Sequence, residues 1–151
     1  MMKLPSTLLW MFAAVCVSAP ALAGLGGDAT SVETDRVSMK GALRVTSGVD
    51  YSVHEIQTAS GMVIHEYVSA VGKVFAVSWR GPGIPDLPQL LGSYSEPLRQ
   101  AARHPHYNHH RLNIETPDVV MHSSAHLRTR SGRAWAPALM PQNFSPKDIG
   151  T

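Results

Sequence analysis

Cysteine is almost absent from this chain of 151 residues. The one cysteine, Cys16, lies in the apolar run Leu8–Val17 near the N-terminus. That run follows Lys3 and precedes Ala21-Leu22-Ala23, and a basic residue, a short apolar stretch and a small-x-small site are the parts of a secretory signal peptide. We predict cleavage after Ala23. The mature chain then has no cysteine, which excludes disulfides, thiolate nucleophiles and cysteine metal sites.

Long hydrophobic runs are missing as well. The leader's apolar run is about half of the roughly 20 residues that cross a bilayer, and no later run is long enough to span one. A lipid-anchored signal would also place a cysteine near position 16, but the bulky Val15 precedes it where a small residue is expected. We therefore expect an exported protein, periplasmic or secreted, with no membrane span.

An excess of charge of one sign is lacking too, since the formal net charge is only +2. Aromatic residues make up 7% of the chain, and they do not interleave with basic residues as a nucleic-acid surface requires, so no nucleic-acid partner is expected. Charge does gather locally, because the last third has many arginines and few acids. This surface is either a solvated basic face or a site for an acidic partner or anionic headgroups. Its arginines are Arg99, Arg103, Arg111, Arg128, Arg130 and Arg133.

Alternating apolar and polar residues predict an antiparallel sheet. Its base is a four-strand meander over residues 42–80. Phe75, Val77 and Trp79 are expected on one face, where they would dominate the core. Within the second strand, Ile56 lies on the face opposite to that of Tyr51. This indicates either a bulge or a strand covered on both sides. The predicted strands are Ala42–Ser47, Tyr51–Thr58, Met62–Val68, Lys73–Arg80 and, as further short C-terminal strands, Leu112–Glu115, Val119–Ser123 and Ala134–Ala136, with a turn at Ser131-Gly132.

Helical spacing of leucines predicts a helix over about 86–103 that packs on this sheet. Asp86 is its expected N-cap, and Pro97 either kinks it or ends it, with Ser95 capping a second piece. A shorter helix is expected from Asp28 or Thr30 to about Met39, ended by Gly41. The fold class is thus α+β. The predicted organisation is a signal peptide at 1–23, a single domain at 24–141 and an irregular tail at 142–151.

Three runs, Leu25–Arg36, Tyr51–Pro82 and Pro85–Tyr94, resemble a bacterial secreted family known as domain of unknown function 2844. The resemblance implies export and a single domain, and it carries over no activity, cofactor or catalytic residue. The paired strands with a glycine turn are also loosely similar to periplasmic PepSY-type modules, which bind or inhibit partners. The chain departs from the family's pattern at Pro97 and in the histidine-rich stretch that follows.

Histidines are concentrated between residues 104 and 126. His104 and His106, two apart on an extended segment, are spaced to share one metal, and His109 or His110 could add a third ligand. These four residues are the candidate metal site, with zinc or copper as the ion. The competing interpretation is a solvated loop, because cysteines are absent and acids are few nearby.

Two catalytic arrangements also deserve mention. His122 or His126 with Ser123 or Ser124 supplies the residue types of a small Ser/His hydrolase, without a recognised nucleophile motif. The dipeptides His54-Glu55 and His65-Glu66 fall on paired strands, either as an acid/base pair or, more simply, as cross-strand polar pairs.

No catalytic set stands out, and this favours a non-enzymatic function. The main hypothesis is a small exported module that binds an envelope or secreted protein through a sheet edge or its basic last third. A histidine-rich metal-binding protein and a small Ser/His hydrolase are the alternatives.

Overall fold

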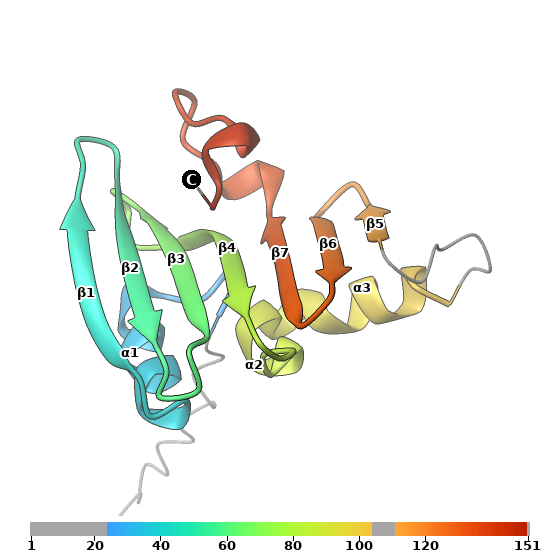
Figure 1. Ribbon diagram of the computed structural model, residues 1–151. Helices are drawn as coiled ribbons and strands as arrows, with labels where there is room; N and C mark the ends of the chain where they lie inside the picture. Colours follow the sequence, from blue (N-terminus) through green and yellow to red (C-terminus); the bar gives the residue numbers. More distant parts are fainter. Residues whose placement is uncertain (1–23, 104–110, 151) are drawn as a thin grey trace, which may run out of the picture.

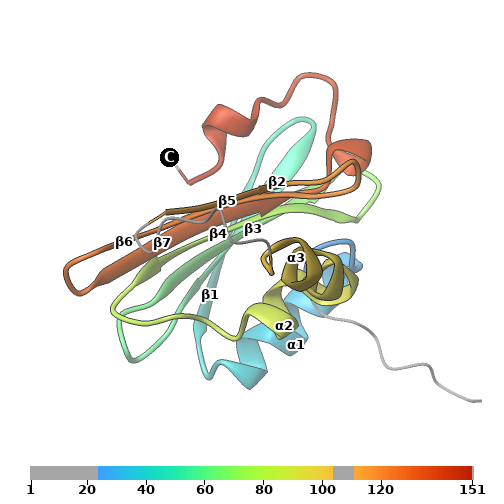
Figure 2. The same cartoon turned by 90° about the vertical axis from the view of Figure 1, so that its right-hand side faces the viewer.

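The computed structural model describes residues 24–103 and 111–150, and the chain in these ranges forms one antiparallel sheet with cover on both faces (Figures 1 and 2). Three helices lie on one face and the C-terminal segment lies on the other. This arrangement confirms the α+β class. The strands are β1 (Ala42–Ser47), β2 (Tyr51–Gln57), β3 (Val63–Ser69), β4 (Val74–Gly81), β5 (Arg111–Glu115), β6 (Val120–His126) and β7 (Thr129–Trp135).

The sheet has seven strands in the order β1-β2-β3-β4-β7-β6-β5. The meander over 42–80 is present, but it is only part of the sheet, because β7 pairs with β4 and brings β6 and β5 with it. The predicted turn at Ser131-Gly132 is wrong, since both residues lie inside β7. Gly132 does not mark a turn. It is needed inside β7 because the ring of Trp79 occupies the space where a Cβ would be, and only glycine allows so close an approach.

The helix layer consists of α1 (Ala29–Ser38), α2 (Leu87–Leu91) and α3 (Ser95–Ala101). As predicted, Asp86 caps α2, and its side chain accepts a hydrogen bond from the N–H of Gln89 at 3.1 Å. The interruption falls at Gly92, with φ 52°, and not at Pro97. Pro97 lies in the first turn of α3, where a missing N–H costs nothing. Leu90 and Leu98 are buried in the core under the sheet.

The end of α1 also differs from expectation. Lys40, and not Gly41, takes the left-handed conformation, with φ 51°. Gly41 is nonetheless required, because a Cβ there would clash with the side chain of Ile56.

A β-bulge in β4 changes which face Phe75 occupies. Tyr67 pairs with Ala76 and Val68 pairs with Val74, so Phe75 has no partner on β3. An extra residue of this kind reverses the alternation that follows it. Val77 and Trp79 therefore lie in the helix-side core as predicted, whereas Phe75 lies in the second core on the opposite face. The prediction that these three residues share one face is wrong for Phe75.

Residues 136–150 form a cover for that second face, which we call the C-terminal strap. Phe144 lies 4.8 Å from Phe75 and 5.0 Å from Tyr51 between ring centroids. The N–H of Gly150 donates to the hydroxyl of Tyr67 at 2.7 Å. β2 has cover on both faces, as one of the two interpretations of its pattern requires: Ile56 is buried in the helix-side core, and Tyr51 and Val53 are partly buried against the second core.

Two further observations complete the fold. Trp135 is buried in the second core. Within the described ranges no helix is long and apolar enough to cross a membrane. The predicted signal peptide lies outside the described residues, and the domain boundary predicted at residue 141 stays a prediction.

Candidate functional site

Strand register places a continuous row of polar side chains across the face that carries the strap. In antiparallel strands, residues directly opposite each other point to the same side of the sheet. Glu55 pairs with His65, and His65 pairs with Ser78. The row continues through β7, β6 and β5, beside the strap. Its members, from β2 to β5, are Glu55, His65, Ser78, Arg133, His122 and Asn113.

A second row lies two residues farther from the strap. It consists of Arg80 on β4, Ser131 on β7, Ser124 on β6 and Arg111 on β5. Three strand spacings of about 4.8 Å separate its two arginines, which places their backbones about 14 Å apart. The hydroxyls of Ser124 and Ser131 lie 3.1 Å apart between them. The row thus has a cation at each end and hydroxyls in the middle.

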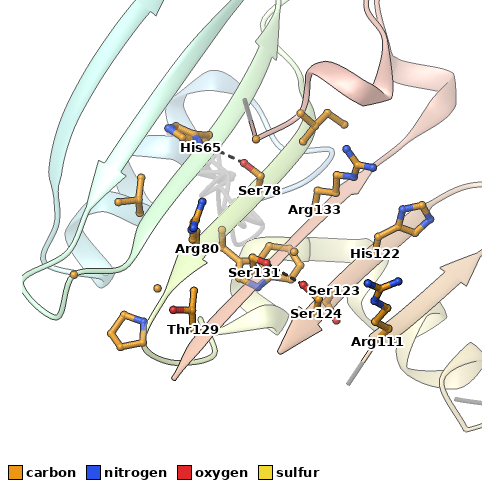
Figure 3. Close-up of a pocket in the computed structure, with 18 of the residues that line it drawn as sticks. His65, Ser78, Arg80, Arg111, His122, Ser123, Ser124, Thr129, Ser131 and Arg133 are labelled. Carbon is orange, nitrogen blue, oxygen red and sulfur yellow. Dashed lines mark hydrogen bonds between the residues drawn. The ribbon is translucent and has the colours of Figure 1, made fainter. Parts of the chain in front are cut away.

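Apart from Glu55, the residues of the two rows line a cavity of about 1010 Å³ (Figure 3). Ile149 and Gly150 of the strap lie along one rim, and Arg128 of the β6–β7 turn and Thr129 at the start of β7 lie at the other end. We call this cavity the basic trough. It is lined by Gly61, Val63, His65, Ser78–Pro82, Arg111, Asn113, His122–Ser124, Arg128, Thr129, Ser131–Arg133, Ile149 and Gly150.

Positive charge in the basic trough is mostly uncompensated. Among the described residues, no aspartate or glutamate lines it. Arg80, Arg111 and Arg128 are exposed, and within the described part of the chain none of them forms an ion pair. Arg133 is fixed in place, because its guanidinium donates to the carbonyl of Pro146 at 3.1 Å and lies 5.8 Å from the ring centre of Trp135. Such a surface attracts anions.

His65 bridges a carboxylate and a hydroxyl on the floor of the trough. Its Nε2 lies 3.1 Å from Glu55 Oε2, and its Nδ1 lies 3.5 Å from Ser78 Oγ. Figure 3 shows His65 and Ser78 turned toward each other, with Arg133 beyond. A carboxylate only accepts hydrogen bonds, so Glu55 favours the imidazole tautomer with hydrogen on Nε2 and leaves Nδ1 as an acceptor.

His122 occupies the corresponding place on the other side of Arg133. Its ring packs edge-on against Trp135 at 5.2 Å, and its Nε2 lies 3.6 Å from Glu115 Oε1. A carboxylate therefore lies beside each of the two histidines in the row. Both carboxylates lie at the outer sides of the row and leave its centre to Ser78 and Arg133.

The opposite face of the sheet holds a second group of ionisable residues. Asp35 of α1 and Glu66 of β3 are both fully buried, and Gln89 Nε2 donates to Asp35 Oδ1 at 2.6 Å. Burial and the neighbouring Asp35 raise the pKa of Glu66 to about 9, and burial also raises the pKa of Asp35. When both are ionised, the two side chains only accept and cannot bond to each other. A proton on one of them turns their contact into a hydrogen bond.

The structure does not test the predicted metal site. His104, His106, His109 and His110 lie outside the described residues, so zinc or copper binding there stays a prediction. In the two ranges that the structure describes, no group of three or more histidines and acids is placed to hold a metal ion.

The predicted Ser/His hydrolase residues are not brought together. On β6, Ser123 points to the face opposite His122, as alternation requires. Ser124 contacts Ser131, and within the described residues it contacts neither His122 nor His126. The pairs His54-Glu55 and His65-Glu66 split across the two faces, because Glu55 contacts His65 on the strap face while Glu66 is buried on the helix side.

Sequence reasoning missed Ser78, Arg80 and the place of Arg133 beside them. Arg133 was part of the basic last third, but β7 enters the sheet next to β4, some 50 positions earlier in the chain. Local alternation gives each strand its two faces and does not say which strands are neighbours. The trough could be predicted only if the pairing of β4 with β7 were known.

This chain is an α+β protein with an open, basic sheet face. A family model described as "Protein of unknown function (DUF2844)" matches residues 21–149. The chain belongs to this family, as the resemblance in the sequence suggested. No curated protein and no solved structure matches it. Its bacterial and secreted character and its likeness to PepSY modules stay predictions.

Proposed function

We propose that this protein is an exported interaction module that holds an acidic, extended segment of another envelope or secreted protein in the basic trough. The observation that carries the proposal is the charge of the trough, which has Arg80, Arg111, Arg128 and Arg133 among its lining residues and no carboxylate. Export rests on the predicted signal peptide.

The size of the trough suits a short stretch of polypeptide. The arginines at the ends of the second row are about 14 Å apart, the length of about four extended residues. The serines between them offer hydroxyls that can donate to carboxylates or to backbone carbonyls. Arginine binds carboxylates with two parallel hydrogen bonds, which adds direction to the attraction.

The aromatic residues support a protein partner over a nucleic acid. Stacking of bases requires exposed aromatic rings. On this face Tyr51, Tyr67 and Phe75 pack against Phe144 under the strap. Of the tryptophan, tyrosine and phenylalanine residues that the structure describes, Trp79 alone lines the trough, and it is buried toward the helix side. This side of the sheet thus offers positive charge without a stacking surface.

Fluorescence anisotropy with a short labelled oligoglutamate peptide tests the proposal. The Arg80→Gln/Arg111→Gln double variant is expected to bind about tenfold or more weakly, because each arginine gives a charge-assisted contact of roughly 1 kcal/mol at a half-open site. Arg130→Gln is the matched control, since Arg130 is exposed on the same strand as Arg133 but points to the other face. Binding should also weaken as salt is raised.

Two outcomes would contradict the proposal. One is peptide binding that Arg130→Gln weakens as much as the double variant does, because affinity would then follow net charge alone. The other is tighter binding of a single-stranded oligonucleotide of equal charge, which would indicate a nucleic-acid ligand.

A further inference from the structure

We propose that Glu55, His65 and Ser78 form a hydrolytic site for anionic carboxylic esters on the floor of the basic trough, with Ser78 as the nucleophile. This inference goes beyond the proposed function and does not rest on it, because it gives the trough a chemical activity that peptide binding does not require.

The arrangement is built into the sheet. Glu55, His65 and Ser78 are direct cross-strand neighbours on β2, β3 and β4, so backbone pairing places the three side chains in line. The imidazole contacts the carboxylate at 3.1 Å and the hydroxyl at 3.5 Å. A nucleophile within reach of a base, and a base oriented by a third group, is the signature of nucleophilic catalysis, and these contacts are often long before substrate binds.

Arg133 supplies the positive charge that an acyl transfer needs. It is the cross-strand neighbour of Ser78 on β7, and Pro146 and Trp135 hold its guanidinium in place. A fixed cation beside the nucleophile can stabilise the oxyanion that forms when an ester carbonyl is attacked. Arg80, exposed on the same strand as Ser78, can bind a carboxylate or phosphate on the substrate. The substrate class is therefore an ester that carries a negative charge near the scissile bond.

The steps balance with water as the only co-reactant. Ser78 Oγ bonds to the ester carbonyl carbon while its proton passes to His65 Nδ1. The carbon–oxygen bond to the alcohol breaks, and the alcohol leaves with that proton. Water then adds to the acyl-serine as His65 takes its proton. The acid product departs, and the proton returns to Ser78.

The strap forms the roof of this site. A Cβ on Gly150 would lie 3.6 Å from Ser78 Oγ, and Ser78 is 5% exposed. Access to Ser78 therefore depends on the position of Gly150, which the hydroxyl of Tyr67 holds.

Labelling with a biotinylated fluorophosphonate tests the nucleophile directly. The reagent should bond to Ser78 Oγ with loss of fluoride, and peptide mass spectrometry should assign the label to that residue. Ser78→Ala should abolish labelling, whereas Ser47→Ala, at an exposed serine of β1, should not change it. Labelling at another serine, or none above the Ser78→Ala background, would overturn the proposal.

Hydrolysis of p-nitrophenyl esters tests the substrate class. A p-nitrophenyl hemi-ester of a dicarboxylic acid should react about tenfold faster than p-nitrophenyl acetate, because only the hemi-ester offers a carboxylate to Arg80. His65→Gln should lower kcat/KM by about a hundredfold, and His126→Gln, at an exposed histidine of β6, serves as its control. Equal rates for the two esters would contradict the assigned substrate class.

Glu55 acts through His65 and is a positioning residue. Glu55→Gln should lower kcat by about tenfold with KM unchanged, and slow fluorophosphonate labelling should persist at Ser78. Glu55→Asp should recover part of the rate. If the two variants were equally slow with raised KM, the role of Glu55 would be structural. Failure of these assays would leave peptide binding to the trough unaffected, so the two proposals can fail separately.

Discussion

The two faces of this sheet differ in how they hold ionisable side chains: one buries them and the other leaves them accessible to water. Under the helices, Asp35 and Glu66 are fully buried with no cation against them in the described chain, and Gln89 is their polar neighbour. On the strap face, charged side chains are exposed or half-buried, and arginines prevail. The buried acid pair on the helix side thus retains a proton because water is excluded from it. The arginines on the strap face keep their charge in contact with water.

The difference in cover between the two faces predicts different effects of substitutions on each. The helix layer covers its side of the sheet with a core that runs from Val32 in α1 to Leu98 in α3. The strap covers the apolar end of its own face, reaches Ser78 and Arg133 of the first polar row, and leaves the second row open. We therefore expect substitutions on the helix side to alter global stability, and those on the strap side to alter access to the trough.

Removing the main strap anchor should have the largest effect. Phe144→Ala leaves Tyr51 and Phe75 without their edge-to-face partner and should cost about 3–5 kcal/mol at the strap. Hydrogen exchange is expected to accelerate in residues 137–150, while α1 and α2 stay protected. Equal acceleration in the helices would show that the two faces unfold as one unit and would remove the distinction between them.

Replacing the buried acid should change the pH dependence of stability. Glu66 keeps its proton in the folded chain up to a pKa of about 9, whereas in the unfolded chain it loses the proton near 4.5. Stability contributed by this group is full below pH 4.5 and is lost as the pH rises toward 9, by at most about 1.4 kcal/mol per pH unit. His54, its cross-strand neighbour, has a lowered pKa because of burial, so its own contribution to stability rises with pH up to its unfolded pKa of about 6.5 and opposes the loss only below that pH.

Glu66→Gln is the variant that checks this expectation. Urea unfolding between pH 5 and pH 9 should show a steep loss of stability in the natural chain and a flatter curve in the variant. At pH 8 the variant should be the more stable by about 1–3 kcal/mol. Parallel curves would mean that Glu66 is ionised in the folded chain.

Loosening the roof of the trough should have the smallest effect on stability. Tyr67→Phe removes the acceptor for the Gly150 N–H and should cost about 1 kcal/mol. Fluorophosphonate labelling of Ser78 should become faster, since Gly150 no longer has a fixed place above it. Slower labelling would indicate that Tyr67 supports the site itself.

Much of the fold could be predicted because it depends on local patterns. Alternation gave the strands between 42 and 80, and Asp86 was recognised as a cap because side-chain capping involves residues three apart. The face of Phe75 was missed since a bulge depends on how β3 and β4 match in register. The break at Gly92 was missed because proline is a stronger signal than glycine, although Pro97 fits the first turn of α3.

The candidate site was less predictable than the fold. Its arginines were identified as a basic surface, but the trough requires the pairing of β4 with β7. Asp35 and Glu66 are 31 positions apart, and nothing local marks either as buried. Acidic residues are usually exposed, so the sequence around Glu66 predicts a polar pair between strands and not a buried acid.

The bulge at Phe75 also limits how the length of this chain can vary among relatives. Deleting Phe75 would restore simple alternation and remove an aromatic ring on which the strap rests. A single insertion before Ser78 in β4 would turn Ser78 and Arg80 toward the helices and Trp79 toward the strap face. Members of the family should therefore tolerate exchanges of residue type in this strand far better than any change in its number of residues.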